Sequence, residues 1–388
     1  MFVFSQLIFT GCDDRQIVEE SDILVGEVIT IKPFEQFIPY DILPILDSVK
    51  FVQLELTEDS FIGEISKVVV FEDQIYIFDK LSYSLFVFDL NGNYIFKIAN
   101  FGRGPGEYIQ IDYFDIDFQK KQIVLTDLMS YSVLRYDLNG DFISQQKIPF
   151  WIEAITPTFD GGFALYSNYR RNLDTFKKEY NLLLLDSMMH ITDAWFSYNS
   201  SNFINPVIKF PLSGSGTFYT YNNEPYFFSP LKRTVYQITR EGLKRVYYFE
   251  GAFFDKTYLN RKDELKKYLE TGDFFSFYSI HETDRYLISN LKKFPSIHTC
   301  LYSKDSGNTI CSAIFTAGAI NFPVLISATY DDWMISIIHP DYLLNWRKNM
   351  EFNNSVSENN FARLKQETAN LITLNDNPLL MFYRLKQF

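Results

Sequence analysis

The sequence predicts an all-β fold, a six-bladed β-propeller with short helical insertions. The main observation is a segment that occurs twice, at residues 75–93 and again at residues 123–141. Each copy has an apolar strand that ends in Asp and a second strand that runs into an Asp-Leu-Asn-Gly turn, and the offset from Asp79 to Asp127 is 48 residues. Repeats of about 40–50 residues that are built from strands are typical of propeller blades.

Aromatic residues support the strand assignment. The chain has 39 Phe and 26 Tyr, and many alternate with other residues in short runs, as at Tyr76 and Phe78 and again at Phe86 and Phe88. This period of two is typical of strands that pack one face. Packing between sheets is the favoured interpretation, and an exposed aromatic face that binds sugars is the alternative.

Later parts of the chain keep the same rhythm with weaker similarity. Two further stretches have a helical pattern, at residues 257–270 and about 358–371. Such stretches can be inserted between strands without breaking the ring of blades. Strand-like pairs occur at residues 161–166 with 180–186, 224–228 with 234–242, and 286–289 with 299–302, and residues 333–338 begin a sixth.

Composition limits the class of protein. Of the 388 residues, 47% are hydrophobic and 22% are charged, which suits one large domain with a substantial core. The formal net charge is -12, and Lys and Arg residues are interleaved with acids. Because binding to phosphate backbones needs clustered positive charge, we exclude nucleic acid as a partner.

The amino end resembles a bacterial lipoprotein signal. Residues 2–9 form a short apolar run, and Phe-Thr-Gly stands directly before Cys12. This pattern resembles the lipobox, in which the cysteine is lipidated and becomes the first mature residue. The run is too short to span a bilayer, so we expect membrane contact only through a lipid anchor on Cys12. The alternative is an ordinary thiol near a frayed terminus.

Neighbouring residues refine the expected location. Asp13 and Asp14 follow the cysteine and resemble the acidic stretch that directs some lipoproteins of Gram-negative envelopes to the cell surface. No Lys or Arg follows Met1, which departs from the pattern and suggests a natural start further upstream. We expect residues 1–22 to be a signal remnant and tether, and residues 23–388 to form the propeller, anchored to the outer membrane and exposed at the surface.

The two remaining cysteines, Cys300 and Cys311, flank a predicted hairpin turn. A turn centred on Asp305 and Ser306 places them opposite each other on neighbouring strands, where an oxidising envelope would allow a disulfide. One extra loop residue would place them on opposite faces, so spacing leaves the pairing open. Neither cysteine has a partner at a metal-ligand spacing.

Three motifs together resemble a known family. They are the glycine-rich segment at residues 100–108, the two Asp-Leu-Asn-Gly turns, and the closing segment at residues 375–386. Over about residues 45–388 they resemble the six-bladed β-propeller lipoproteins of bacterial envelopes, relatives of NHL-repeat propellers. The resemblance implies that an early strand at residues 51–56 completes the last blade beside residues 379–385, which removes the open edges. It implies little about mechanism, because such proteins are described mostly by fold.

Three loops resemble ligand-binding motifs, and each has a simpler structural interpretation. Residues 102–106 could cradle a phosphate, but no Lys-Ser or Lys-Thr follows, so an inter-blade turn is favoured. The segment from Asp89 begins like a calcium loop, yet Asn100 stands at the position of the distal Glu. Residues 303–310 resemble the Asp-box of sialidase propellers, which is a turn scaffold.

The four histidines, His190, His281, His298 and His339, have no local metal spacing. Their convergence on the propeller axis is left open, as is a triad of histidines around a metal. Two charged pairs, Arg170–Arg171 and Asp331–Asp332, lie near inferred strand ends and could reach the central funnel, although charged pairs in loops are usually solvated. We predict no metal and no other cofactor, and the sequence identifies no catalytic residue.

Two functional classes fit these observations. The favoured one is a monomeric, non-enzymatic envelope lipoprotein whose propeller face binds a glycan, a peptide or an envelope protein. The alternative is a carbohydrate-active hydrolase or lyase with its site in the funnel. Arg103 and Glu107 are the first candidates for ligand binding, because they are the charges within the glycine-rich motif. The competing interpretation is a buried Arg103–Glu107 pair that locks adjacent blades.

Overall fold

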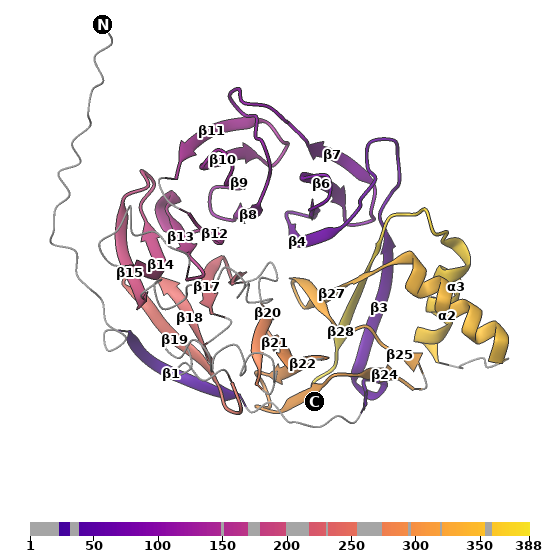
Figure 1. Cartoon of the computed structure of the whole chain (residues 1–388). Coiled ribbons are helices and arrows are strands. Elements are labelled where there is room, and N and C mark those ends of the chain that lie inside the picture. Colours follow the sequence, from indigo (N-terminus) through magenta and orange to yellow (C-terminus); the bar gives the residue numbers. More distant parts are fainter. Residues whose placement is uncertain are drawn as a thin grey trace, which may run out of the picture.

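The computed structural model describes residues 23–31, 39–148, 151–169, 179–198, 217–229, 232–253, 274–293, 296–318, 320–353 and 359–388. Within these residues the chain is an all-β propeller, with antiparallel sheets arranged around a central axis and helices α2 (Pro340–Asn353) and α3 (Asn360–Leu371) outside the ring (Figure 1). The predicted fold class is confirmed at this level.

Four sheets are meanders of consecutive strands. The first two contain the duplicated segment, and their strands are β4 (Ile65–Phe71), β5 (Gln74–Asp79), β6 (Ser84–Asp89) and β7 (Tyr94–Ile98), then β8 (Tyr113–Asp117), β9 (Gln122–Asp127), β10 (Ser132–Asp137) and β11 (Phe142–Lys147). The other two are β12 (Ala154–Pro157), β13 (Phe163–Tyr166), β14 (Glu179–Leu185) and β15 (Ile191–Tyr198), then β20 (Ser276–Glu282), β21 (Tyr286–Lys293), β22 (Ser296–Ser303) and β23 (Thr309–Ser312).

Two further sheets recruit a strand from the beginning of the described chain. One contains β16 (Phe218–Tyr221), β17 (Glu224–Phe228), β18 (Thr234–Thr239) and β19 (Gly242–Phe249), and β1 (Leu24–Ile31) pairs with β19 in parallel. The other contains β26 (Ile326–Tyr330), β27 (Trp333–Ile338), β28 (Leu379–Leu385) and β3 (Leu46–Gln53).

The ring is closed by β3 and β28, as the family resemblance implied, although the early strand expected at residues 51–56 begins and ends earlier, at Leu46–Gln53. They pair in antiparallel register, from Leu379 opposite Gln53 to Leu385 opposite Leu46. The innermost strands β4, β8, β12, β16, β20 and β26 contact one another in chain order, and β26 returns to β4. Closure therefore joins the two ends of the domain and leaves no open edge at this point.

The expected number of blades was wrong. The described residues form seven sheets, so that the propeller counted by sheets has seven blades instead of six. The additional sheet has three short strands, β2 (Tyr40–Asp41), β24 (Phe315–Ala317) and β25 (Ile320–Asn321). These segments lack the repeat pattern, and β2 pairs with β24 across a long stretch of chain, so local sequence could not reveal them. Figure 1 shows β24 and β25 beside β3, on the side of α2 and α3.

The duplicated segment gives equivalent hydrogen bonds in both copies. The Asp79 carboxylate accepts from the backbone N–H groups of Glu64 and Leu81 at 2.8 and 3.0 Å. The Asp127 carboxylate accepts from the N–H groups of Ile109 and Ser130 at 2.7 and 3.0 Å. Each carboxylate therefore ties the turn after its own strand to the loop that enters the blade, which explains why this Asp recurs at a fixed offset.

Both Asp-Leu-Asn-Gly segments form tight turns between neighbouring strands. Asp89 accepts hydrogen bonds from its own turn, and Gly92 has a φ of +88°, while the equivalent Gly140 has a φ of +89°. Glycine adopts this left-handed backbone without strain, so the turn interpretation holds and the calcium-loop interpretation is unnecessary. The first copy of the repeated segment also contributes to the hydrophobic core, because Phe86 and Phe88 pack with residues of the closing sheet.

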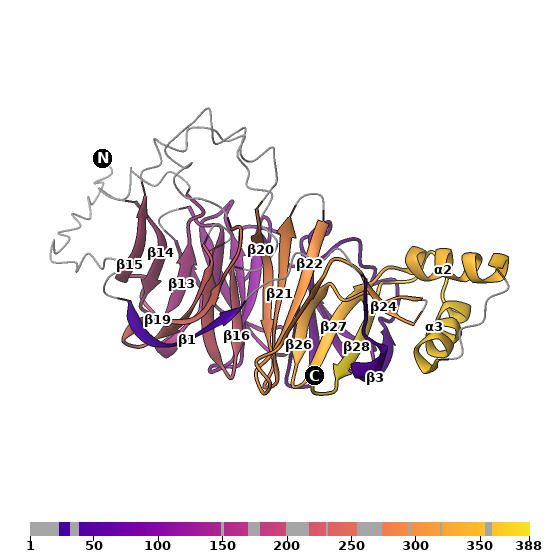
Figure 2. The same cartoon turned by 90° about the horizontal axis from the view of Figure 1, so that it is seen from below.

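Helical segments were partly anticipated. α3 matches the helix expected near residues 358–371, and its N-cap Asn359 accepts a hydrogen bond from the Ala362 N–H. The helix expected at residues 257–270 lies outside the described residues, and α2 was not anticipated. Two short 3-10 helices, Leu43–Ile45 and Phe159–Gly161, complete the helical content of the described chain. In Figure 2 the α2–α3 pair projects sideways from the ring.

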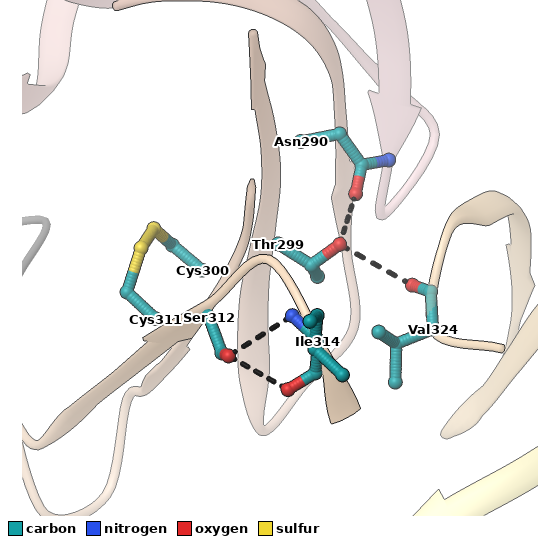
Figure 3. The surroundings of a disulfide bond; sticks show 7 residues. All are labelled: Asn290, Thr299, Cys300, Cys311, Ser312, Ile314 and Val324. Carbon is teal, nitrogen blue, oxygen red and sulfur yellow. Dashed lines mark hydrogen bonds between the residues drawn. A yellow bond between two sulfur atoms is a disulfide. The ribbon is translucent and has the colours of Figure 1, made fainter. Parts of the chain in front are cut away.

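The register between β22 and β23 decides whether the two cysteines can pair. Cys300 on β22 lies directly opposite Cys311 on β23, and the two form a disulfide (Figure 3). This is the register produced by the turn centred on Asp305 and Ser306, one of the two alternatives that the sequence left open. The same strands carry Thr299, whose hydroxyl donates to the Asn290 side chain at 2.8 Å.

Candidate functional site

Two connected cavities lie where the innermost strands meet. The central channel has a volume of about 430 Å³ and is lined by residues of β4, β8, β16, β20 and β26. The mouth has a volume of about 470 Å³ and lies at the hairpin turns that follow four of these strands. Five residues line both cavities, so the two are continuous: Val70, Phe118, Thr220, Glu282 and Thr329.

Turn chemistry explains the polar character of the mouth. Asn222 and Asn223 have φ values of 51° and 60°, and Asp331 has a φ of 49°. Two-residue hairpin loops need positive φ, and Asn and Asp adopt it more readily than other residues with a side chain. The short turns between the innermost strand and the next strand therefore place amide and carboxylate groups around the opening.

The channel holds a buried ion pair between two blades. The Lys67 ammonium lies 3.0 Å from the Asp115 carboxylate, and it also donates to the Tyr113 hydroxyl at 3.2 Å and the Phe114 carbonyl at 2.9 Å. Asp115 in turn accepts from the Thr156 hydroxyl of the next blade at 2.9 Å. Burial alone would lower the pKa of Lys67, but Asp115 and Tyr113 outweigh it and the pKa is raised. The ammonium is thus fully engaged by the protein itself.

Glu282 is the second charged group at this level and joins two other blades. Its carboxylate accepts from the hydroxyls of Tyr219 at 2.8 Å and Tyr247 at 2.5 Å, and the Lys304 ammonium lies 2.7 Å away. Burial raises the pKa of both tyrosines, and the neighbouring Glu282 charge raises it further. The hydroxyls therefore stay protonated as donors, and the carboxylate has a complete set of partners.

His281 differs from these satisfied groups. It lines the channel, one ring nitrogen hydrogen-bonds the backbone of Ile326, and Nε2 is buried with no hydrogen-bond partner in the described chain. Burial is the main cause that lowers the pKa of His281 to about 4; the hydrogen bond to Ile326 opposes this shift and the Lys67 charge adds to it. The ring is neutral at pH 7, so Nε2 is an acceptor that faces no donor.

The mouth is lined by acidic residues. Glu282, Asp284, Asp331 and Asp332 line it, and no Lys or Arg is among the described residues that do so. Asp284 accepts from the Tyr221 hydroxyl at 3.0 Å, and the Oδ1 atom of Asp332 is buried without a hydrogen-bond partner in the described chain. A cavity lined by one sign of charge concentrates the electric field, so the mouth attracts positive charge.

The residues chosen from the sequence lie elsewhere. Neither Arg103 nor Glu107 lines the two cavities. Glu107 accepts from the Gly104 N–H at 2.7 Å and so closes its own loop, while Arg103 is exposed and forms no ion pair with Glu107 in this described loop. The Tyr136 hydroxyl of the next blade donates to the Gly106 carbonyl at 2.7 Å, which confirms the inter-blade turn. The alternative of a buried Arg103–Glu107 pair is not what the structure shows.

Other candidates are distributed as follows. His281 and His339 line the channel, whereas His190 pairs with Asp186 in an exposed turn and His298 packs against an aromatic ring. In the described ranges, no group of three or more His, Cys, Asp or Glu side chains could hold a metal ion. Cys12 lies outside the described residues, so lipid attachment stays a prediction. No helix of the described chain is long and apolar enough to cross a membrane.

Sequence reasoning missed Lys67, Asp115, Glu282 and Asp284, whereas it noted Asp331 and Asp332 as a charged pair that could reach the funnel. One signal was available: Lys67 and Asp115 are charged residues within innermost strands that are mostly apolar, where an unpaired charge would be costly. That signal implies a partner but cannot say which residue it is, because the partners come from different blades.

Fold and site together define an all-β propeller with a charged axial channel and an acidic mouth. The family described as a domain of unknown function, DUF4934, matches residues 29–384, and the chain belongs to this family. No curated protein matches the chain.

Two solved structures are similar in fold. An exported-protein candidate from Bacteroides fragilis NCTC 9343 has 20% sequence identity and a TM-score of 0.74, and the match covers 93% of this chain and 100% of that one. A member of the DUF4221 family from Bacteroides vulgatus has 10% identity and a TM-score of 0.49, over 88% of this chain and 97% of that one. At such identities the first likeness shows the propeller fold and nothing about activity.

Proposed function

We propose that this chain is a non-enzymatic binding protein of the bacterial cell envelope, held to the outer membrane by a lipid on Cys12, and that its partner binds at the mouth. The observation that carries the proposal is the open cavity of about 470 Å³, built by hairpin turns on a rigid ring and continuous with the channel. Loops on a rigid scaffold bind ligands without a fixed catalytic set.

A mouth variant tests the binding site. Thr220 lies at the junction of the two cavities, and a Thr220→Trp substitution would fill that junction while it keeps a residue suited to a strand. Labelled protein would be applied to arrays of envelope glycans and peptides. We expect Thr220→Trp to lose capture of the wild-type ligand at an unchanged melting temperature.

Two control variants complete the test. Thr30→Trp makes the same change at an exposed position on β1 and should keep capture. Arg103→Ala tests the earlier candidate loop, which remains a prediction. Loss of capture in Arg103→Ala together with full capture in Thr220→Trp would move the binding site to the glycine-rich loop and refute the mouth.

Location is tested separately. When the full natural signal is present, Cys12→Ala should move the protein from the membrane fraction to the soluble fraction. The substitution removes the attachment point of the acyl chains, and stable anchoring needs several such chains. Equal membrane retention of the variant would refute the lipid anchor.

The competing function is a hydrolase or lyase that acts within the channel. It is favoured by one observation: Asp115, Glu282, His281 and His339 all line that channel. One observation argues against this function: Asp115 and Glu282 already form ion pairs with lysines of the protein, and Asp115 also accepts a hydrogen bond from Thr156. A general acid or base must instead be available to the substrate. Turnover of an array glycan by the wild type, lost in His281→Gln, would favour this alternative.

A further inference from the structure

The mouth contains an excess of carboxylates over cations. Glu282 is neutralised by Lys304, but Asp284, Asp331 and Asp332 form no salt bridge within the described residues. Asp331 and Asp332 are consecutive, so two negative charges stand at a single turn. Repulsion between these groups is relieved when a positive group binds, which a neutral ligand does not achieve.

Buried acceptors without donors give a second, independent observation. Oδ1 of Asp332 in the mouth and Nε2 of His281 in the channel are both buried and lack a hydrogen-bond partner in the described chain. Most buried polar atoms in proteins have a partner, and an unmatched acceptor costs free energy. One residue with such an acceptor lines each of the two connected cavities, which favours a ligand that carries hydrogen-bond donors.

The chain itself shows how this site takes a positive group. The Lys304 ammonium lies 2.7 Å from the Glu282 carboxylate and 3.9 Å from the centroid of the Tyr221 ring. A carboxylate together with an aromatic face is a well-matched environment for an ammonium. The mouth offers further examples of both groups, because Phe71, Phe118 and Tyr330 line it with the free carboxylates.

We propose that the mouth recognises ammonium or guanidinium groups and that its ligand is a lysine- or arginine-bearing peptide segment whose side chains enter toward the channel. This deepens the proposed function and rests on it, since it names the ligand class for the same site. A peptide suits the space better than a single amine does, because the mouth and the channel together hold several side chains, with volumes of about 470 and 430 Å³.

The test uses a fluorescein-labelled tetralysine peptide in anisotropy titrations with the full chain. A tetraglutamine peptide is the neutral probe, maltotetraose is the glycan competitor, and spermidine is the free-amine competitor. The site variant is Asp331→Asn/Asp332→Asn, in which Asn keeps the shape and tolerates the φ of 49° at position 331. The matched control is Asp141→Asn/Glu241→Gln, which removes the same charge from two exposed turns outside the cavities.

We expect tetralysine to bind the wild type, to weaken as salt is raised, and to bind the site variant about tenfold more weakly, with no change in the control. Displacement by spermidine would show that free amines share the site and would support the recognised chemistry. Equal tetralysine affinity in the site variant and the wild type would overturn the inference.

Failure of this inference can be told from failure of the proposed function. Binding of maltotetraose or tetraglutamine that Thr220→Trp abolishes, without binding of tetralysine, would overturn the cationic ligand and keep the mouth as a binding site. Absence of Thr220-dependent capture of any probe or array ligand would overturn both.

Discussion

The channel and the mouth use the same residue types in opposite ways. In the channel, the charges of Lys67 and Asp115 are paired across blades at 3.0 Å, and Glu282 is paired with Lys304 at 2.7 Å. In the mouth, Asp331 and Asp332 have no cation among the described residues. Paired buried charges hold blades in register, whereas unpaired charges at an opening are available to a ligand, so the difference separates structural groups from binding groups.

Removal of the Glu282 charge should have the largest effect on stability. In Glu282→Gln the Lys304 ammonium loses its counter-charge, and one of the tyrosine hydroxyls loses a strong acceptor. We expect the free energy of unfolding to fall by about 4 kcal/mol in urea titrations at pH 7. Asp284→Asn is the control, because it also removes a carboxylate that accepts from a tyrosine but stands at the exposed mouth; equal losses would contradict the comparison.

Loss of the Lys67–Asp115 pair should have the second largest effect on stability. Lys67→Met leaves the Asp115 carboxylate buried without its cation, which should cost about 3 kcal/mol of unfolding free energy. Lys67→Met/Asp115→Asn should recover part of that loss, since the stranded charge is gone. A double-mutant cycle measures this coupling, and additive losses would show that the two groups act independently.

His281, in the channel, predicts that the stability of the fold depends on pH. The pKa of this histidine is lowered from 6.5 to about 4 in the folded chain, so the unfolded chain binds the proton first as the pH falls. Stability from this group is therefore complete above pH 6.5 and is lost as the pH falls toward 4, by at most about 1.4 kcal/mol per pH unit. Unfolding of His281→Gln should show a shallower loss across this window. Parallel profiles for variant and wild type would contradict the buried neutral ring.

Neutralisation of the mouth should have the smallest effect on folding. Asp331→Asn/Asp332→Asn should change the unfolding free energy by less than about 0.5 kcal/mol, because the carboxylates hold no partner in the described fold. Thermal unfolding measures this directly, with Asp141→Asn/Glu241→Gln as the control. A loss comparable to that of Glu282→Gln would show that the rim acids are structural and would remove the contrast between the two cavities.

Much of the architecture could be predicted because it is local. The Asp79 and Asp127 clamps, the glycine turns at 92 and 140 and the alternating aromatics each depend on a few neighbouring residues, and the fixed offset reveals them. Closure by an early and a late strand was expected from the family resemblance, which placed the early strand at residues 51–56 where the structure has β3 at Leu46–Gln53. The seventh sheet was not, because β2 and β24 have no repeat and meet only after the chain has folded.

The site could not be predicted to the same extent. Arg103 and Glu107 were chosen because the glycine-rich loop is conspicuous, yet that loop packs between blades and Glu107 closes its own turn. Glu282 has partners on β16, β19 and in the turn after β22, which are far apart in the sequence. No spacing rule connects such residues.

By itself, the sequence determined the all-β class, the repeated blade and the two possible registers of the cysteine hairpin, because strand periodicity and turn chemistry act over a few residues. Only the tertiary structure decided which register forms the Cys300–Cys311 bond, which charges are paired in the channel and which acids gather at the mouth. Those outcomes depend on how separate blades are arranged around one axis. The free energy of a charge is set by its neighbours in space, and the fold brings these neighbours together from distant parts of the chain.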